Sequence, residues 1–245
     1  MEKISVAIIT LNEEKNIERC LESVRWADEI VVVDTFSTDR TVEICRRFTD
    51  RVFQETWQGY GPQKNLCASR AANRWILNVD ADEVITAECA EAIRNLLAGE
   101  PERPVYRFPR KNFFGKRWVR HAGWYPDRIA RLYDKSRAAF SESMVHERLI
   151  PDDDAGLIDF PILHYSFAGM EDYIRRQNRY SSIYAEEKIR NGWRANWTHL
   201  YLRPPWVFFK TCFLRQGFRE GFLGVFLSLA MAFYTYLKYA KTRSV

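Results

Sequence analysis

Two carboxylates spaced one residue apart follow an apolar run near the middle of the chain. Asp80 and Asp82 lie in the tetrapeptide Asp80-Ala81-Asp82-Glu83, directly after Trp75–Val79. In an extended segment, residues i and i+2 point the same way, so both carboxylates would reach one target. Two hard oxygen ligands with open positions beside them suit Mg²⁺ or Mn²⁺ bridging a diphosphate. The alternative is an ordinary strand end followed by a helix cap, because this spacing is common by itself.

A second acid strengthens the metal and diphosphate interpretation. Asp34 ends another apolar run, Glu29–Val33, which is rich in β-branched residues. Buried strands that end in acids are costly unless the acids are solvated, paired or bound to a metal. A strand-end carboxylate can accept hydrogen bonds from a nucleobase N–H or a ribose hydroxyl. Three polar residues follow, and for them the alternative interpretation is that they cap the next helix: Ser37, Thr38 and Asp39.

The elements that must position these acids alternate between strands and helices. Apolar runs predict strands over 4–10, 29–33, 51–54 and 75–79. Between them, Asn12 is expected to cap a helix whose apolar face holds Ile17, Cys20, Leu21 and Val24, and further helices are expected over 41–48 and 64–73. This alternation predicts an α/β fold with a mostly parallel, doubly wound sheet. Ligands bind beyond the carboxyl ends of such strands, where residues 10–13, 34–39 and 80–83 all fall.

The pattern changes after a helix expected over 86–97. Residues 105–110, 116–120, 128–133 and 158–164 predict strands joined by turns, a small antiparallel addition to the sheet. From Gly169 onward the pattern is helical, with breaks at Gly192 and at Pro204-Pro205. We therefore expect a first domain over 1–165, with a nucleotide-binding part over about 4–120 and an acceptor part over about 104–165, and a helical region over 166–245.

Composition narrows the protein class. The 245 residues, 47% of them hydrophobic, suffice for one core with an appendage and exclude a disordered tail. Five scattered cysteines without a C-x-x-C pair predict reduced thiols in the cytosol, and the apolar start 4–9 is too short for a secretory signal. Residues 160–245 carry 13 Lys and Arg against 5 Asp and Glu, whereas residues 1–159 carry 24 against 27. The back half is therefore expected to face something anionic.

The last third of the chain combines aromatic and basic residues. Residues 221–237 hold no charge over 17 positions, whereas a membrane-spanning helix needs about 20, with about 17 the lower limit. We expect residues 205–241 to lie on a membrane surface as an interfacial helix pair flanked by cations. The alternatives are a core helix and a spanning helix. Nucleic acid is not expected as a partner, because no RNA-binding motif is present and the front half is acidic.

Three segments taken in order resemble the family 2 glycosyltransferases: Ser5–Glu14, Val31–Asp34 with its polar loop, and Asp80–Glu83. The resemblance implies a GT-A fold, a Rossmann-like nucleotide-binding α/β domain. Three further segments are similar to a subgroup that acts in lipopolysaccharide core synthesis and adds a β-linked sugar to the inner-core heptose: Lys64-Asn65, Val145-His146-Glu147 and Leu163-His164-Tyr165-Ser166. This likeness implies a UDP-sugar donor, glucose being the favoured sugar, and a lipid-linked glycan acceptor at the inner face of the cytoplasmic membrane.

The resemblance also implies roles for single residues. Thr10, Asn12 and Glu13 would line the nucleotide pocket, Asp34 would contact uracil or ribose, Lys64 would lie near the base or diphosphate, Asp80 would hold the ribose or sugar, and Asp82 would ligate Mg²⁺ or Mn²⁺. The family's glycine-rich second motif is here Thr35-Phe36-Ser37, without glycine. A side chain at Phe36 keeps a ligand farther from the backbone than glycine would, so the contacts of this loop stay open.

An inverting transfer needs one carboxylate to take the proton of the acceptor hydroxyl, a contribution of roughly 10²- to 10⁴-fold. The candidates are Glu147, Asp127 and Glu142, and Glu147 is preferred because it follows the antiparallel segment, with His146 placed to orient it. The alternative for Glu147 is a surface residue paired with Arg148.

Other functions share parts of this pattern. A sugar-nucleotide nucleotidyltransferase would use the same sheet and metal carboxylates, but it needs a glycine-rich basic loop that residues 10–13 do not supply. A non-catalytic, membrane-associated nucleotide-binding module is the alternative outside enzymes. Zinc is disfavoured because the spacing of the four histidines, His121, His146, His164 and His199, fits no zinc pattern.

Overall fold

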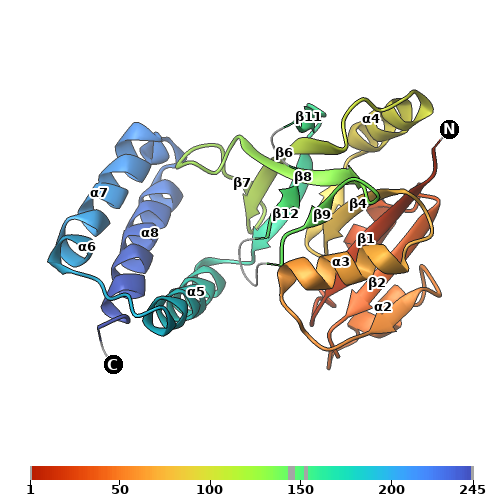
Figure 1. Ribbon diagram of the computed structural model, residues 1–245. Coiled ribbons are helices and arrows are strands. Elements are labelled where there is room, and N and C mark those ends of the chain that lie inside the picture. Colours follow the sequence, from red (N-terminus) through yellow and green to blue (C-terminus); the bar gives the residue numbers. More distant parts are fainter. Residues whose placement is uncertain (1, 143–146, 152–153, 244–245) are drawn as a thin grey trace. The chain divides into compact units, whose positions relative to one another are not determined.

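The computed structural model describes residues 2–142, 147–151 and 154–243 of the chain (Figure 1). They form two compact units. The first comprises Met1–Arg110 and Arg128–His164, and the second comprises Lys111–Asp127 and Tyr165–Val245. Each unit has a hydrophobic core of its own, and each is described separately below.

The parallel part of the sheet lies in the first unit, where four strands lie side by side (Figure 1). Their order is β3 (Val52–Gln54), β2 (Glu29–Asp34), β1 (Ile4–Thr10) and β4 (Trp75–Asp80), and all neighbours are parallel. Thr10 of β1 is in register with Asp34 of β2, and Ile9 with Asp80 of β4. Asp34 and Asp80 therefore end the two strands that flank β1, at the same edge of the sheet.

Helices cover both faces of these strands because the side chains of β1 alternate between them. Val6 and Ile8 belong to one buried cluster with Ile17 and Leu21 of α1 (Ile17–Ser23). That cluster also holds residues of α2 (Thr41–Cys45) and α4 (Ala87–Ala98). Ala7 of β1 belongs to a second cluster with residues of α3 (Tyr60–Arg70). The predicted doubly wound arrangement is confirmed.

The antiparallel addition continues the sheet beyond β4. The order runs on through β8 (Asp127–Asp134), β6 (Val105–Phe114), β12 (Ile162–Phe167) and β5 (Glu83–Ile85), with short β7 (Arg117–Trp118) and β11 (Gly156–Leu157) also paired to β6. Strand β8 runs antiparallel to β4, and β12 runs antiparallel to β5. Strands β9 (Ala139–Phe140) and β10 (Leu149–Ile150) form a separate antiparallel pair. The strand expected over 158–164 begins later, at Ile162.

The second unit is mainly helical. Its long helices are α5 (Met170–Arg190) and α8 (Phe222–Ala240), with α6 (Trp197–Tyr201) and α7 (Arg203–Phe209) alongside α8 (Figure 1). A π-helical turn, Lys210–Leu214, and a 3₁₀ turn, Gly217–Glu220, join α7 to α8. A Cβ atom on Gly224 would lie 1.8 Å from the Gly217 carbonyl oxygen, so this close approach requires glycine.

Helix α8 has two different faces. One face packs in the unit and contains buried Leu223, Leu227 and Tyr239. The other presents large apolar side chains to the surface: Phe222, Val225, Leu229, Phe233 and Tyr236. By length and composition α8 is the one helix among the described residues that would suffice to cross a membrane.

Candidate active site

Asp34 is a buried carboxylate that neutral donors hold in place. It is fully buried at the end of β2. The Thr10 hydroxyl donates to its Oδ1 over 2.9 Å, and the Ser37 backbone N–H donates to its Oδ2 over 2.8 Å. The Ser37 hydroxyl also donates to Oδ1, and the Gln54 amide lies 3.4 Å from Oδ2. No cation pairs with Asp34 in the described part of the chain, so these bonds fix its orientation without cancelling its charge.

The loop after β1 differs from the sequence prediction. Asn12 does not cap a helix: α1 begins at Ile17, and Asn12 takes a left-handed conformation with φ of 55°. Its Oδ1 accepts the Thr38 backbone N–H over 2.8 Å, and its own N–H donates to the Ser37 hydroxyl over 2.8 Å. The cap prediction is wrong because the loop after β2 offers these partners. Glu13 anchors the same loop, donating its backbone N–H to the Thr41 hydroxyl over 2.8 Å.

Phe36 occupies the position where the family motif would carry glycine, and it adopts a glycine-like backbone. Its φ is 54°, a conformation that disfavours side chains with a Cβ atom, and its side chain is 54% exposed. Such strain persists where surrounding bonds over-determine the backbone. Here the two bonds from Ser37 to Asp34 do so.

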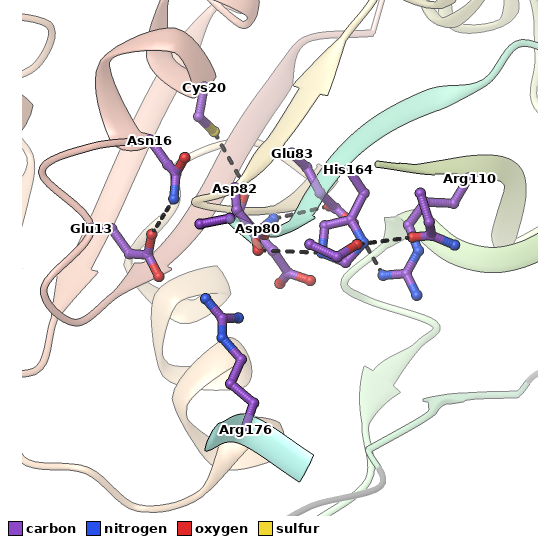
Figure 2. A network of polar contacts seen from close by, with 12 residues as sticks. Glu13, Asn16, Cys20, Asp80, Asp82, Glu83, Arg110, His164 and Arg176 are labelled. Atoms are coloured by element: carbon purple, nitrogen blue, oxygen red, sulfur yellow. Dashed lines mark hydrogen bonds and ion pairs between the residues drawn. The ribbon is translucent and has the colours of Figure 1, made fainter. Parts of the chain in front are cut away.

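Asp80 and Asp82 do not share a target through extended geometry. Strand β4 ends at Asp80 and the chain turns at Ala81 and Asp82, so the i, i+2 argument does not apply. Asp80 instead shares a cation with Glu83. Arg131 pairs with Asp80 and lies 2.6 Å from Glu83 Oε1, and Arg110 lies 3.4 Å from the same oxygen. Figure 2 shows these acids gathered in one polar network.

Opposite charges beside Asp80 and Arg131 favour the charged form of each. Burial alone would raise the pKa of Asp80, but the charges of Arg131 and Lys64 lower it well below its ordinary value. Burial opposes the charge of Arg131, but Asp80 and Glu83 raise its pKa further. Cys20 donates its thiol to the Asp80 carbonyl oxygen over 3.5 Å, and burial and the nearby acids raise the pKa of that thiol. The thiol is therefore a structural group and not a nucleophile.

Lys64 joins Glu147 to the strand-end acids. Its side chain is only 3% exposed, and its Nζ lies 2.8 Å from Glu147 Oε1 and 3.3 Å from Asp80 Oδ1. The ammonium also lies 5.2 Å from the centre of the Phe140 ring. Oε2 of Glu147 has no hydrogen-bond partner among the described residues. One oxygen of Glu147 is thus positioned by Lys64.

Asp82 faces a histidine. Its Oδ2 lies 3.3 Å from His164 Nε2, and both side chains are 16% exposed (Figure 2). The carboxylate oxygen suits Mg²⁺ or Mn²⁺, whereas imidazole is a ligand of transition metals, so of these two ions the pair fits Mn²⁺ better. Among the described residues no three His, Cys, Asp or Glu side chains are grouped to hold a metal. A metal at Asp82 and His164 would therefore depend on further oxygens from a diphosphate or water.

The remaining base candidates have other surroundings. Asp127 belongs to the second unit, where its Oδ2 accepts from the Asn112 amide over 3.2 Å. Glu142 is exposed on the surface. His146, expected to orient Glu147, lies outside the described residues, as does Val145 of the same motif.

Sequence reasoning missed Arg131, although it supplies the central cation of the network. A signal was available, because Arg131 stands between Ala130 and Leu132 in a segment predicted to be a strand. A charged residue that is 5% exposed in such a strand requires acidic partners. The pairing of Leu132 with Leu77 of β4 brings them within reach.

Comparisons with known proteins identify relatives over the whole chain. The family model described as glycosyl transferase family 2 matches residues 5–149. An uncharacterized glycosyltransferase of Rickettsia felis is 34% identical over 99% of this chain and 90% of its own length. The lipopolysaccharide core biosynthesis glycosyltransferase LpsC of Rhizobium meliloti is 30% identical over 97% of this chain and 91% of its own. The crystal structure of S. aureus TarS 1–349 is similar with a TM-score of 0.51 and 18% identity, over 96% of this chain and 91% of that chain.

Proposed function

This chain belongs to glycosyl transferase family 2, and from that premise we propose that it is a metal-dependent, inverting enzyme moving glucose from UDP-glucose to a lipid-linked glycan such as the lipopolysaccharide inner core. The predicted GT-A fold class is confirmed. Family membership also makes the chain a glycosyltransferase, in place of the nucleotidyltransferase or the non-catalytic module. The donor, the metal, the acceptor and the residue roles are the proposal.

The donor site rests on one observation above all: Asp34 and Asp80 end the two strands that flank β1 at one sheet edge. Asp34 would accept hydrogen bonds from the uracil N–H or the ribose, since the groups that donate to it are neutral and do not compensate its charge. Thr10, Asn12 and Glu13 would line the pocket around it. Asp80 would hold the ribose or sugar, in an orientation fixed by Arg131 and Lys64.

Asp82 and His164 would hold Mn²⁺ or Mg²⁺ beside the diphosphate. When bound, the metal neutralises the charge that grows on the leaving diphosphate. The protein's part is to keep the carboxylate and imidazole facing each other before the donor arrives, so that little reorganisation accompanies the reaction.

Glu147 is the proposed general base, and its support is the ion pair with Lys64. The Lys64 ammonium contacts both Glu147 and Asp80, so Glu147 lies close to Asp80 in the unit that carries the proposed donor site. Oε2 would take the proton of the acceptor hydroxyl as that hydroxyl attacks the sugar in a single displacement with inversion. Asp127 remains the alternative base.

The lipid-linked acceptor is supported by the surface of the second unit. Exposed large apolar side chains line α7, the π-helical turn and one face of α8, with Trp206, Phe209, Phe213, Phe222 and Phe233 among them. One face of α8 is packed in the unit and the other is exposed, a pattern that favours an interfacial helix over a spanning one. We place the enzyme on the cytosolic face of the membrane. The name of the relative LpsC agrees with such an acceptor.

The proposal is tested by screening UDP-sugars with lipid-extracted acceptors while free UDP and pyrophosphate are measured separately. We expect UDP release that depends on both acceptor and Mn²⁺, with UDP-glucose preferred. Pyrophosphate release would instead support a nucleotidyltransferase, and release of neither product would support a binding module. Full activity in EDTA would contradict the metal assignment.

A further inference from the structure

A basic cavity lies within the second unit, apart from the residues assigned to the donor. Its volume is about 380 Å³, and its wall includes Arg120, His121, Gly123, Leu214, Arg215 and Gln216. Residues 120–123 follow β7, and residues 214–216 are the last residue of the π-helical turn and the two that follow it. Two segments about ninety positions apart in the sequence thus build one cavity.

The charge of this cavity is not compensated. Neither Arg120 nor Arg215 forms an ion pair with an acid anywhere in the described residues, and both side chains are exposed. Arg120 is held over the Trp118 ring, with its guanidinium carbon 4.3 Å from the ring centre. Glu220, which is bonded to the wall residue His121, already has its own hydrogen-bond partners. It accepts from Arg117 over 2.9 Å, from His121 Nδ1 over 2.7 Å, and from two backbone N–H groups.

The backbone around the cavity is built for this arrangement. Ala122 and Gln216 both have positive φ, 59° and 55°, although neither is glycine. The Ala122 N–H donates to the Arg215 carbonyl oxygen over 2.8 Å, which ties the two segments together. Gly123 has a φ of 83°, a conformation that favours glycine, and the Arg215 guanidinium lies against it. Strain of this kind gathers at ligand sites.

The surroundings of the cavity are apolar. Leu214, in the cavity wall, is 59% exposed, and Phe213 and Phe218 beside it are 50% and 53% exposed. A soluble anion gains nothing from such side chains, whereas a phosphate carried by a lipid brings apolar chains to meet them. Two arginine guanidinium groups on one wall match the charge of a phosphate monoester, and each can donate two parallel hydrogen bonds to its oxygens.

We propose that this cavity binds the phosphate monoester of a lipid-borne ligand, through Arg120 and Arg215. His121, oriented by Glu220, lines the site. The inference deepens the proposed function, since it rests on a lipid-linked acceptor for the carrier of the phosphate. It assigns that phosphate to the second unit, separately from the donor's diphosphate in the first.

The test measures binding of the full chain to phosphatidylcholine vesicles that contain either phosphatidic acid, a monoester, or phosphatidylglycerol, a diester, at matched surface potential. We expect tighter binding to phosphatidic acid. The double variant Arg120→Gln/Arg215→Gln should lose that preference, by roughly fivefold per arginine. The control Arg179→Gln/Arg190→Gln removes the same charge from exposed positions on α5 and should weaken both bindings equally.

Equal binding of the wild type to the two vesicles would overturn the proposal, as would an equal loss of preference in the control variant. Inorganic phosphate is added as a competitor to identify the source: displacement shows that the phosphate group alone is recognised, and resistance shows that the lipid carrier is also required. UDP binding is measured on the same samples. A protein that fails to bind UDP but keeps its phosphatidic acid preference would refute the donor proposal and leave this one standing.

Discussion

The two units differ in where their charged side chains lie. In the first, the buried acids Asp34, Glu83 and Asp134 sit at strand ends or beside them, each held by hydrogen bonds or cations. In the second, Glu220 is the one buried acid among the described residues, and arginines and aromatic rings occupy the surface. The difference teaches that the first unit holds its buried acids in fixed positions, whereas the second exposes large apolar side chains, a surface that suits the lipid contact proposed above.

The largest effect should come from the proposed base. Glu147→Gln keeps an acceptor for Lys64 but removes proton abstraction, so we expect transfer to fall by roughly 10²- to 10⁴-fold. UDP binding should be unchanged, because the donor contacts stay in place. Glu142→Gln is the matched control and should transfer normally. Undiminished turnover of Glu147→Gln, together with loss of turnover in Asp127→Asn, would identify Asp127 of the second unit as the base. The first unit would then not be the one that supplies the catalytic acid–base group.

The metal assignment predicts the next largest effect. Asp82→Asn removes one of the two facing donors, and we expect roughly 10²- to 10³-fold slower UDP release together with weaker Mn²⁺ binding in the presence of UDP. His164→Gln should behave similarly. Asp50→Asn removes an exposed acid from the same unit and should leave both measurements unchanged. Wild-type Mn²⁺ affinity in Asp82→Asn would show that the metal is held elsewhere.

The proposed membrane contact predicts which side chains of the second unit bind lipid. Phe222→Ser/Phe233→Ser removes side chains that are 76% and 55% exposed on α8. Burial of a phenylalanine contributes about 1.5–3 kcal/mol, so vesicle binding should weaken about tenfold or more. Sedimentation with neutral vesicles measures this loss of binding. Ile174→Ser, 48% exposed on α5, is the control. Equal losses in the two variants would mean that the α8 face has no special role.

Glu220 predicts a smaller effect on stability. Burial would raise the pKa of Glu220, but hydrogen bonds from His121, two backbone N–H groups and Arg117 lower it. A carboxyl group with a lowered folded pKa stabilises above its unfolded pKa of about 4.3, and this contribution disappears as pH falls through the folded pKa. We expect Glu220→Gln to reduce the free energy of unfolding at pH 7 by about 2 kcal/mol.

Denaturant unfolding followed at pH 7 and at acid pH checks this effect. The difference between the wild type and Glu220→Gln should shrink as pH falls below about 4. Glu171→Gln, at an exposed position of α5, should unfold like the wild type at every pH. A stability gap that persists at acid pH would show that Glu220 acts through packing and not through its charge.

The smallest effect concerns backbone strain in the first unit. Phe36→Gly relieves a φ of 54° and should raise the free energy of unfolding by about 1 kcal/mol. Leu11→Gly is the control, because Leu11 is 49% exposed and does not have a positive φ. It should destabilise instead, through the added entropy of the unfolded chain. Thermal unfolding of both variants decides whether the loop stores strain.

The sequence predicted the parallel half well because its strands are short, apolar and bounded by polar residues. Asp34 and Asp80 were correctly placed at strand ends, since parallel strands end at a common edge. The sequence-based prediction was wrong or incomplete where a side chain's partner lies far away in the sequence. Asn12 accepts a hydrogen bond from Thr38, twenty-six residues away, and does not cap a helix. Arg131 contacts Glu83 because strand pairing brings the two residues together. Neither contact is encoded in local periodicity.

The donor site in the first unit is the central claim, and a crystal structure with UDP and Mn²⁺ tests it most directly. We predict that the nucleotide lies at the carboxyl edge of β1, β2 and β4, with uracil or ribose hydrogen-bonded to Asp34 and the diphosphate beside Asp82 and His164. Electron density for the nucleotide away from this edge, with Asp34 touching no part of it, would contradict the account.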